Sequence, residues 1–185
     1  MNTRIISMLV CLLFAATSMF GQSDFAKGGI YYKINPNLKD VTVTSCPQDS
    51  AIYSGKIVIP AKVEYDGNTY SVTHIGKYAF KNSEITAVTL PEGIIEIGEE
   101  AFRECSGLKS VAIPASVLHI GKQAFIFCFS LSTLSFKSAS RPVIDSYAFG
   151  KTKVKMSGID TGIPANMAVP NQDKRFKIDG GVVTY

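Results

Sequence analysis

Three ionisable residues recur at nearly constant spacing and could together form a metal site. His74, Glu96 and His119 follow one another at intervals of 22 and 23 residues, and each directly precedes an isoleucine. Imidazole and carboxylate groups are suitable zinc ligands. These residues would, however, lie on an exposed strand, and the sequence supplies no further polar groups to orient them. A solvated strand face is the favoured interpretation, and we predict no metal site and no cofactor.

Two cysteines share this periodicity and could form a disulfide. Cys105 and Cys128 are 23 residues apart, so in a stacked repeat they lie on neighbouring coils, near the Cα separation that a disulfide needs. An exported protein would meet the oxidising conditions that permit the bond. Side chains stacked in parallel seldom reach disulfide torsion angles, so two buried thiols are the favoured alternative. Cys46, in Ser45-Cys46-Pro47, is predicted to be a free thiol in a loop.

One triplet, Asp160-Thr161-Gly162, matches the motif of aspartic proteases. That chemistry needs two carboxylates that share a proton, and the chain has a single triplet. A turn is therefore the better interpretation. The sequence also lacks a P-loop, a serine nucleophile elbow and a zinc-protease helix motif. We predict that the chain is not an enzyme.

Length and composition place the chain among ordered, turn-rich proteins. It has 185 residues, 46% of them hydrophobic and 18% charged, with 15 Gly and 8 Pro. This apolar content makes global disorder implausible, and the length suits one well-buried domain. The net charge of +4 comes from 19 basic and 15 acidic residues without a clustered basic stripe. The mixture excludes a typical nucleic-acid binder, so we predict no nucleic-acid partner.

Residues 1–21 have the pattern of a secretory signal peptide. Arg4 precedes the apolar run Ile5–Phe14, and small residues follow, as in the charged, apolar and small regions of such a signal. The run is shorter than the ~20 residues that cross a bilayer. We predict no transmembrane segment, cleavage after Ser18 or Gly21, and export of the rest. A periplasmic, secreted or cell-surface destination stays open.

The middle of the chain repeats with a period of about 23 residues, which is typical of a solenoid. The element Gly-x-x-Ala-Phe occurs in three full copies and one degenerate copy: Gly76–Phe80, Gly98–Phe102, Gly121–Phe125 and Asp145–Phe149. A second element with alternating apolar residues runs between them: Ile85–Pro91, Leu108–Pro114 and Leu131–Phe136. One such unit cannot bury its apolar side alone, so the copies must stack on one another.

Stacking assigns a structure to each element. The alternation within residues 87–90 and 110–113 predicts strands that pair in parallel between coils, and Pro91 and Pro114 end these strands. The segments containing Ile94-x-x-Ile97 and Val117-x-x-Ile120 are predicted to lie on the opposite side. Gly-x-x-Ala-Phe is predicted to be a helical turn. Its phenylalanines are expected to stack as an aromatic ladder: Phe80, Phe102, Phe125 and Phe149.

Leu108–Cys128 carries the complete pattern L-x-x-V-x-I-P-x-x-V-x-x-I-G-x-x-A-F-x-x-C, which resembles the BspA-type leucine-rich repeat of bacterial surface proteins. The resemblance covers residues 65–149 closely. It implies a right-handed leucine-rich solenoid, mostly of β-structure, with a parallel sheet on the concave side, short helical turns and a buried thiol in each motif. It also implies adhesion or protein binding at a cell surface and carries no catalytic residues.

The ends of the chain are predicted to cap this solenoid, because its terminal coils would otherwise expose apolar surface. Residues 22–63 form a strand-rich N-terminal cap, 64–149 the leucine-rich repeats and 150–185 the C-terminal cap. Strands are expected at 29–34, 41–44 and 57–60, with a hairpin over 63–70 that turns at Asp66-Gly67. Alternating lysines over 151–155 indicate a charged edge strand.

The concave strand face is the candidate binding surface. Its outward positions are small and rich in hydroxyl groups, and they include Thr86, Thr89, Lys109, Ser110, Ser132 and Ser135. Such a face could bind an extended peptide or a glycan, although a merely solvated sheet is the alternative. Phe127 and Phe129 flank Cys128, and one of them is expected to be an exposed apolar contact.

The predicted function is thus an exported, non-catalytic adhesion module that recognises protein or glycan through this face. The alternative is a structural component whose caps dock a partner chain. The oligomeric state is left open.

Overall fold

The structure is a computed structural model and describes residues 23–46, 53–137, 142–157, 177–179 and 182–184. Those residues form strands and turns, without a helix. The strands are β1 (Phe25–Lys27), β2 (Ile30–Ile34), β3 (Asp40–Thr44), β4 (Ser54–Val58), β5 (Lys62–Tyr65), β6 (Asn68–Ile75), β7 (Glu84–Thr89), β8 (Glu96–Ile97), β9 (Ser110–Ile113), β10 (His119–Ile120), β11 (Thr133–Phe136), β12 (Val143–Ile144), β13 (Lys155–Ser157), β14 (Lys177–Asp179) and β15 (Val182–Thr184).

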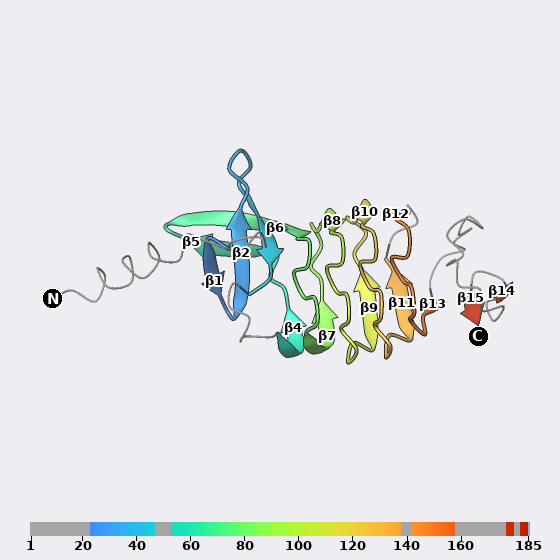
Figure 1. The fold of residues 1–185 in the computed structure, drawn as a ribbon. Helices are drawn as coiled ribbons and strands as arrows, with labels where there is room; N and C mark the ends of the chain where they lie inside the picture. Colours follow the sequence, from blue (N-terminus) through green and yellow to red (C-terminus); the bar gives the residue numbers. More distant parts are fainter. Residues whose placement is uncertain (1–22, 47–52, 138–141, 158–176, 180–181, 185) are drawn as a thin grey trace.

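The repeats stack as successive coils, each with one longer strand and one short strand on opposite sides (Figure 1). On the first side β4 pairs with β7, and β9, β11 and β13 form a parallel ladder. On the second side the end of β6 pairs in parallel with β8, β8 with β10 and β10 with β12. The predicted parallel pairing between coils and the short opposite segments are confirmed. The handedness of the coil stays a prediction.

The coil interior contains the predicted aromatic ladder. Phe80, Phe102 and Phe125 are fully buried. Their ring centroids are 5.0 and 4.9 Å apart, and Phe149 continues the stack at 5.2 Å from Phe125. Leucine, isoleucine and valine from the two strand sides surround this ladder in one continuous core. Because every coil places the same residue type at the same depth, each ring covers the next.

The Gly-x-x-Ala-Phe segments form overlapping tight turns, so the prediction of a helical turn is wrong. In the first copy, the N–H of Ala79 donates to Gly76 O, and Tyr78 has a left-handed φ of 61°. The N–H of Phe80 then reaches out of its own coil to Ala101 O, at 2.7 Å. Equivalent bonds join the later coils, from Phe102 to Ala124 and from Phe125 to Ala148. A helix would direct these donors along its own axis, whereas the coils need them for stacking.

The glycine that opens the second and third copies permits this close approach. A Cβ on Gly98 would lie 2.9 Å from Lys77 N, and one on Gly121 would lie 2.7 Å from Glu99 N. Both contacts are with backbone, which cannot rotate away. A larger residue at Gly98 or Gly121 would therefore clash with the preceding coil, whereas the degenerate fourth copy carries Asp145 at this position.

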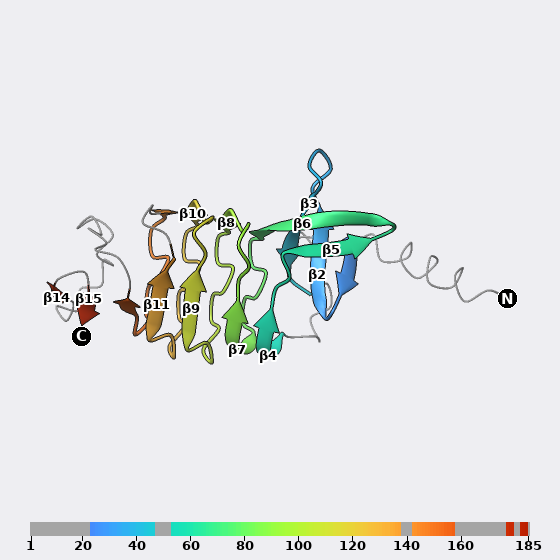
Figure 2. The same cartoon turned by 180° about the vertical axis from the view of Figure 1, so that it is seen from behind.

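The N-terminal cap is an antiparallel arrangement that continues into the coils. Strands β1, β2 and β3 pair antiparallel, β5 and β6 form the predicted hairpin, and β3 pairs in parallel with β6 (Figure 2). The hairpin turns at Asp66 and Gly67, with φ of 48° and 71°, as a two-residue turn with left-handed conformations requires. Tyr53 joins the cap to the first coil, since its ring lies 4.7 Å from Phe80 and its hydroxyl donates to Thr44 O at 2.9 Å.

At the other end, the expected edge strand over residues 151–155 begins only at Lys155, where β13 pairs with β11. Residues 152–154 lie outside any strand, and Val154 is buried. The predicted signal peptide at 1–21 and the triplet Asp160-Thr161-Gly162 lie outside the described residues. The predicted boundaries of the two caps stay predictions.

Candidate binding face

The side of the solenoid that carries β4, β7, β9 and β11 brings the candidate binding residues together. Thr86 in β7, Lys109 just before β9 and Ser132 just before β11 are linked by backbone bonds: Lys109 N–H donates to Thr86 O at 3.4 Å and Ser132 N–H to Lys109 O at 3.0 Å. Because these residues occupy one position in successive coils, their side chains form a row across the solenoid. Neighbouring strands set the spacing within the row to about 4.8 Å.

Two further rows lie beside the first. Lys56 pairs with Ala87 and Thr133 with Ser110, whereas Val58 pairs with Thr89 and Ser135 with Ala112. The residues between these rows point inward, since Val88, Val111 and Leu134 are all buried. The alternation of the sequence therefore corresponds to an outward and an inward set, as predicted.

We call the six predicted residues Thr86, Thr89, Lys109, Ser110, Ser132 and Ser135 the hydroxyl face. Five of them are exposed, and Ser135 is half-buried. The Ser132 hydroxyl donates to Lys109 O at 3.4 Å, a long bond that leaves its acceptor capacity for solvent or a ligand. The arrangement offers hydroxyl groups at strand spacing beside one ammonium group. It can form hydrogen bonds with an extended or polyhydroxylated ligand, and it has no group placed for covalent catalysis.

The opposite side carries the predicted ladder of ionisable residues. Glu96 pairs in register with His74 on one side and His119 on the other. His119 Nδ1 lies 3.4 Å from Glu96 Oε1, and its Nε2 lies 3.1 Å from Asp145 Oδ2. His74 Nδ1 instead bonds the hydroxyl of Thr73 at 2.7 Å. Within the described ranges, no three His, Cys, Asp or Glu side chains are grouped to hold a metal ion.

The two repeat cysteines are free, buried thiols, which confirms the favoured interpretation over a disulfide. Cys105 Sγ donates to Phe80 O and Cys128 Sγ to Phe102 O, each at 3.0 Å. Each thiol thereby satisfies a carbonyl of the preceding coil. A hydrogen bond with Cys105, together with burial, raises the pKa of the Cys128 thiol. Cys46 is a half-buried free thiol outside any strand.

Sequence reasoning missed a charged cluster on the turn side. Glu100 is a buried residue, only 8% exposed. Its carboxylate lies 3.1 Å from both Lys81 Nζ and Arg103 Nη1. Burial alone would raise the pKa of Glu100, but the hydrogen bonds and charges of Lys81 and Arg103 outweigh it and hold the pKa below its ordinary value. Lys81 and Arg103 occupy one position of successive copies, which is the only sign of this cluster in the sequence.

Phe129 is the exposed aromatic residue of the pair that flanks Cys128. Its side chain is 55% exposed, whereas Phe127 is half-buried and carries Arg103 above its ring at 5.7 Å. The expectation that one of the two is exposed is confirmed, and its role as a contact stays a prediction. No helix long and apolar enough to cross a membrane occurs in the part of the chain that the structure describes.

The repeat pattern described as BspA type leucine rich repeat region matches residues 69–164 in six copies. The chain belongs to this family. A solved leucine-rich repeat protein from Bacteroides capillosus is 30% identical, with a TM-score of 0.63 over 74% of this chain and 100% of its own. No protein with a curated description matches the sequence.

Two further solved members are larger than this chain. A leucine-rich repeat protein from Bacteroides ovatus has 30% identity and a TM-score of 0.63 over 74% of this chain, which spans 35% of that protein. A leucine rich cell surface protein from Faecalibacterium prausnitzii has 26% identity and a TM-score of 0.53 over 77% of this chain, which spans 44% of it. The leucine-rich repeat fold expected from the sequence is thus shown.

Proposed function

We propose that this chain is an exported, non-catalytic binding module that recognises a protein or glycan at a bacterial cell surface. The hydroxyl face is the proposed contact surface. The observation that supports it most directly is the alignment of exposed Thr86, Lys109 and Ser132 into a row, beside the exposed Thr89 and Ser110. The similar protein from Faecalibacterium prausnitzii is described as a cell surface protein, which supports the proposed location.

The physical basis is a repeated hydrogen-bonding surface on a rigid support. Each strand contributes hydroxyl groups at a fixed height, and the buried partners Val88, Val111 and Leu134 hold the strand positions. A ligand that extends across the strands can bond several coils at once, so modest contacts add up over the array. The few large side chains on this face favour a flat ligand over one that inserts a bulky group.

The test is a triple substitution on the hydroxyl face, Thr89→Asp, Ser110→Asp and Ser135→Asp. The mature chain is screened on arrays of glycans and matrix proteins, and the variant is then measured against each ligand found. We expect binding to fall by at least about tenfold, because three carboxylates both repel and fail to donate hydrogen bonds. The matched control is Asn82→Asp, Ser106→Asp and Ser146→Asp, which adds three carboxylates at exposed positions of the turn side.

Equal binding by the triple variant and the native chain would overturn the proposal. If the same ligand were lost on truncation of residues 150–185, the alternative of docking through the caps would replace it. Loss in both triple variants would indicate a general charge effect and would also count against the hydroxyl face.

A further inference from the structure

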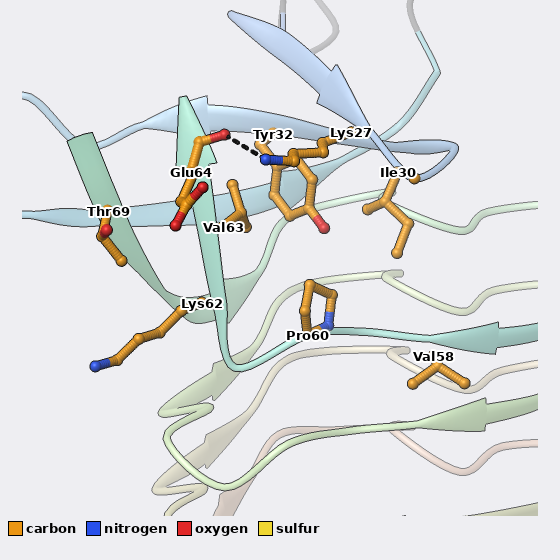
Figure 3. A pocket seen from close by; sticks show the side chains of 10 residues that line it. Lys27, Ile30, Tyr32, Val58, Pro60, Lys62, Val63, Glu64 and Thr69 are labelled. Atoms are coloured by element: carbon orange, nitrogen blue, oxygen red, sulfur yellow. Dashed lines mark hydrogen bonds between the residues drawn. The ribbon is translucent and has the colours of Figure 1, made fainter. Parts of the chain in front are cut away.

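A cavity of about 480 Å³ lies where the N-terminal cap meets the first coil, next to the Thr89 end of the hydroxyl face. Figure 3 shows Val58 and Pro60 on one wall, with Ile30, Tyr32 and Val63 of the cap on the other. The volume falls within the range of about 300–1,000 Å³ that ligand pockets occupy. Tyr32 is 1% exposed, and this burial raises the pKa of its phenol to about 12, so the phenol is uncharged at neutral pH.

The same corner contains an open strand edge. Strand β4 pairs with β7 alone among the described strands. The N–H of Ile59, directly after β4, donates to Thr89 O at 3.1 Å. Because successive residues of a strand direct their backbone groups to opposite edges, the N–H and C=O of Val58 are directed away from β7. Val58 is also 67% exposed, so its side chain is accessible on the face of the strand beside that open edge.

The rim of the cavity carries an excess of positive charge. Lys27 and Lys62 are both exposed, and neither is ion-paired with a carboxylate of the described residues. Lys27 Nζ donates to the backbone oxygen of Glu64 at 3.1 Å, which holds the ammonium group over the cavity (Figure 3). The Glu64 side chain also lines the rim, so the balance is two positive charges against one negative. One carboxylate supplied by a ligand would neutralise the remaining positive charge.

We propose that this corner binds an extended peptide segment of a partner protein, by strand addition to the open edge of β4. One apolar side chain of the segment enters the cavity between Val58 and Tyr32. A carboxylate two residues along lies on the same side of the extended segment and pairs with Lys27, while Lys62 adds positive charge at the rim. Strand addition supplies backbone hydrogen bonds that any sequence can make, and the cavity with its lysines supplies the selectivity.

The probe is a capped synthetic peptide with phenylalanine and aspartate two positions apart in a serine–threonine background. Its affinity for the full mature chain is measured by fluorescence anisotropy. We expect Lys27→Glu with Lys62→Glu to weaken binding at least about tenfold. Lys33→Glu with Lys39→Glu, two exposed lysines of the same cap outside the cavity, makes the same charge change and should leave the affinity unchanged. Glu64→Gln should strengthen binding, because it removes the one repelling carboxylate.

A change in the peptide tests strand addition without altering the protein. N-methyl groups on alternate residues in one phase remove the hydrogen bonds to β4, and the other phase leaves them intact. We expect the first peptide to lose binding and the second to keep it. A peptide with lysine in place of aspartate should bind the Lys27→Glu, Lys62→Glu variant better than the native chain.

Three outcomes would overturn the proposal: no binding of the acidic probe, equal loss in the two lysine variants, or equal tolerance of both N-methylation phases. A Ser110→Asp, Ser135→Asp variant, which leaves Thr89 beside Val58 unchanged, separates this site from the hydroxyl face. It should bind the probe as the native chain does, and loss there would assign the peptide to the hydroxyl face instead.

Discussion

The coils and the N-terminal cap bury aromatic residues in opposite ways. In the coils one residue type repeats, and Phe80, Phe102 and Phe125 stack with nearly parallel rings, 10° and 3° between planes. In the cap each contact occurs once: Phe25 lies 4.2 Å from Tyr65, and Tyr65 is 40% exposed. In the coils the same aromatic contact is repeated from one copy to the next, whereas the cap depends on contacts that each occur once.

This difference locates the two proposed sites. Repetition produces a uniform surface, so the hydroxyl face is a regular array that extends over several coils. The periodic spacing ends where β4 meets the cap, and there the two packings do not match. The result is the cavity beside Val58 and an unpaired strand edge. The proposed peptide site therefore lies where the repeat stops, and the proposed hydroxyl face lies where it continues.

The largest expected effect comes from interrupting the ladder. Phe102→Ala should lower the free energy of unfolding by about 3–5 kcal/mol, because the ring is fully buried between two others. Tyr65→Ala in the cap should cost no more than about 1.5 kcal/mol, since that ring is partly exposed and makes one stacked contact. Urea denaturation followed by circular dichroism measures both. Equal costs would show that the cap and the coils do not differ as described.

A smaller effect is expected from the buried carboxylate of the coils. Glu100→Gln should lower stability by about 1–3 kcal/mol at neutral pH, because charged hydrogen bonds to Lys81 and Arg103 are lost. The pKa of Glu100 is lowered in the folded chain, so its contribution is complete above the unfolded pKa and disappears as the pH falls through the folded value. The native chain should therefore lose its advantage over the variant in acid.

Denaturation midpoints of the two chains, measured from neutral pH down to acid, test this sign. The exposed pair Lys77–Glu99 is the matched control, since its ion pair of 2.7 Å lies in solvent. Glu99→Gln should leave the stability unchanged. A difference between native chain and Glu100→Gln that grew as the pH fell would contradict the argument.

The sequence predicts features that repetition or local chemistry dictates. Position in the repeat predicts the stacked Phe80 and its equivalents and the outward Thr86 and Lys109. The residue types at Asp66-Gly67 predict the turn there. Strand β1 and the cavity were not predicted, since they depend on which distant segments meet in the cap. The helical turn at Gly-x-x-Ala-Phe was predicted wrongly for a related reason. The N–H groups of Phe80 and its equivalents bond the next coil, and a local pattern does not show where a donor finds its partner.

The smallest expected difference compares cysteines from the two regions. Cys128→Ala should cost about 1–2 kcal/mol, because it removes a buried sulfur that bonds Phe102 O. Cys46→Ala should leave the stability nearly unchanged, since Cys46 is half-buried and outside any strand. The same urea denaturation, under reducing conditions, measures both.

Alkylation mapped by mass spectrometry gives an independent reading of the same contrast. The Cys128 thiol is fully buried with a raised pKa, so it can react only when the coils open. Its alkylation should therefore accelerate steeply in urea below the unfolding midpoint, whereas that of Cys46 should change little. Phe102→Ala should bring the two rates closer by opening the stack that covers Cys128. Equal alkylation rates of Cys128 and Cys46 in the native chain would contradict this prediction. They would show that the coils open locally often enough to expose Cys128, so that burial in the repeat does not protect it.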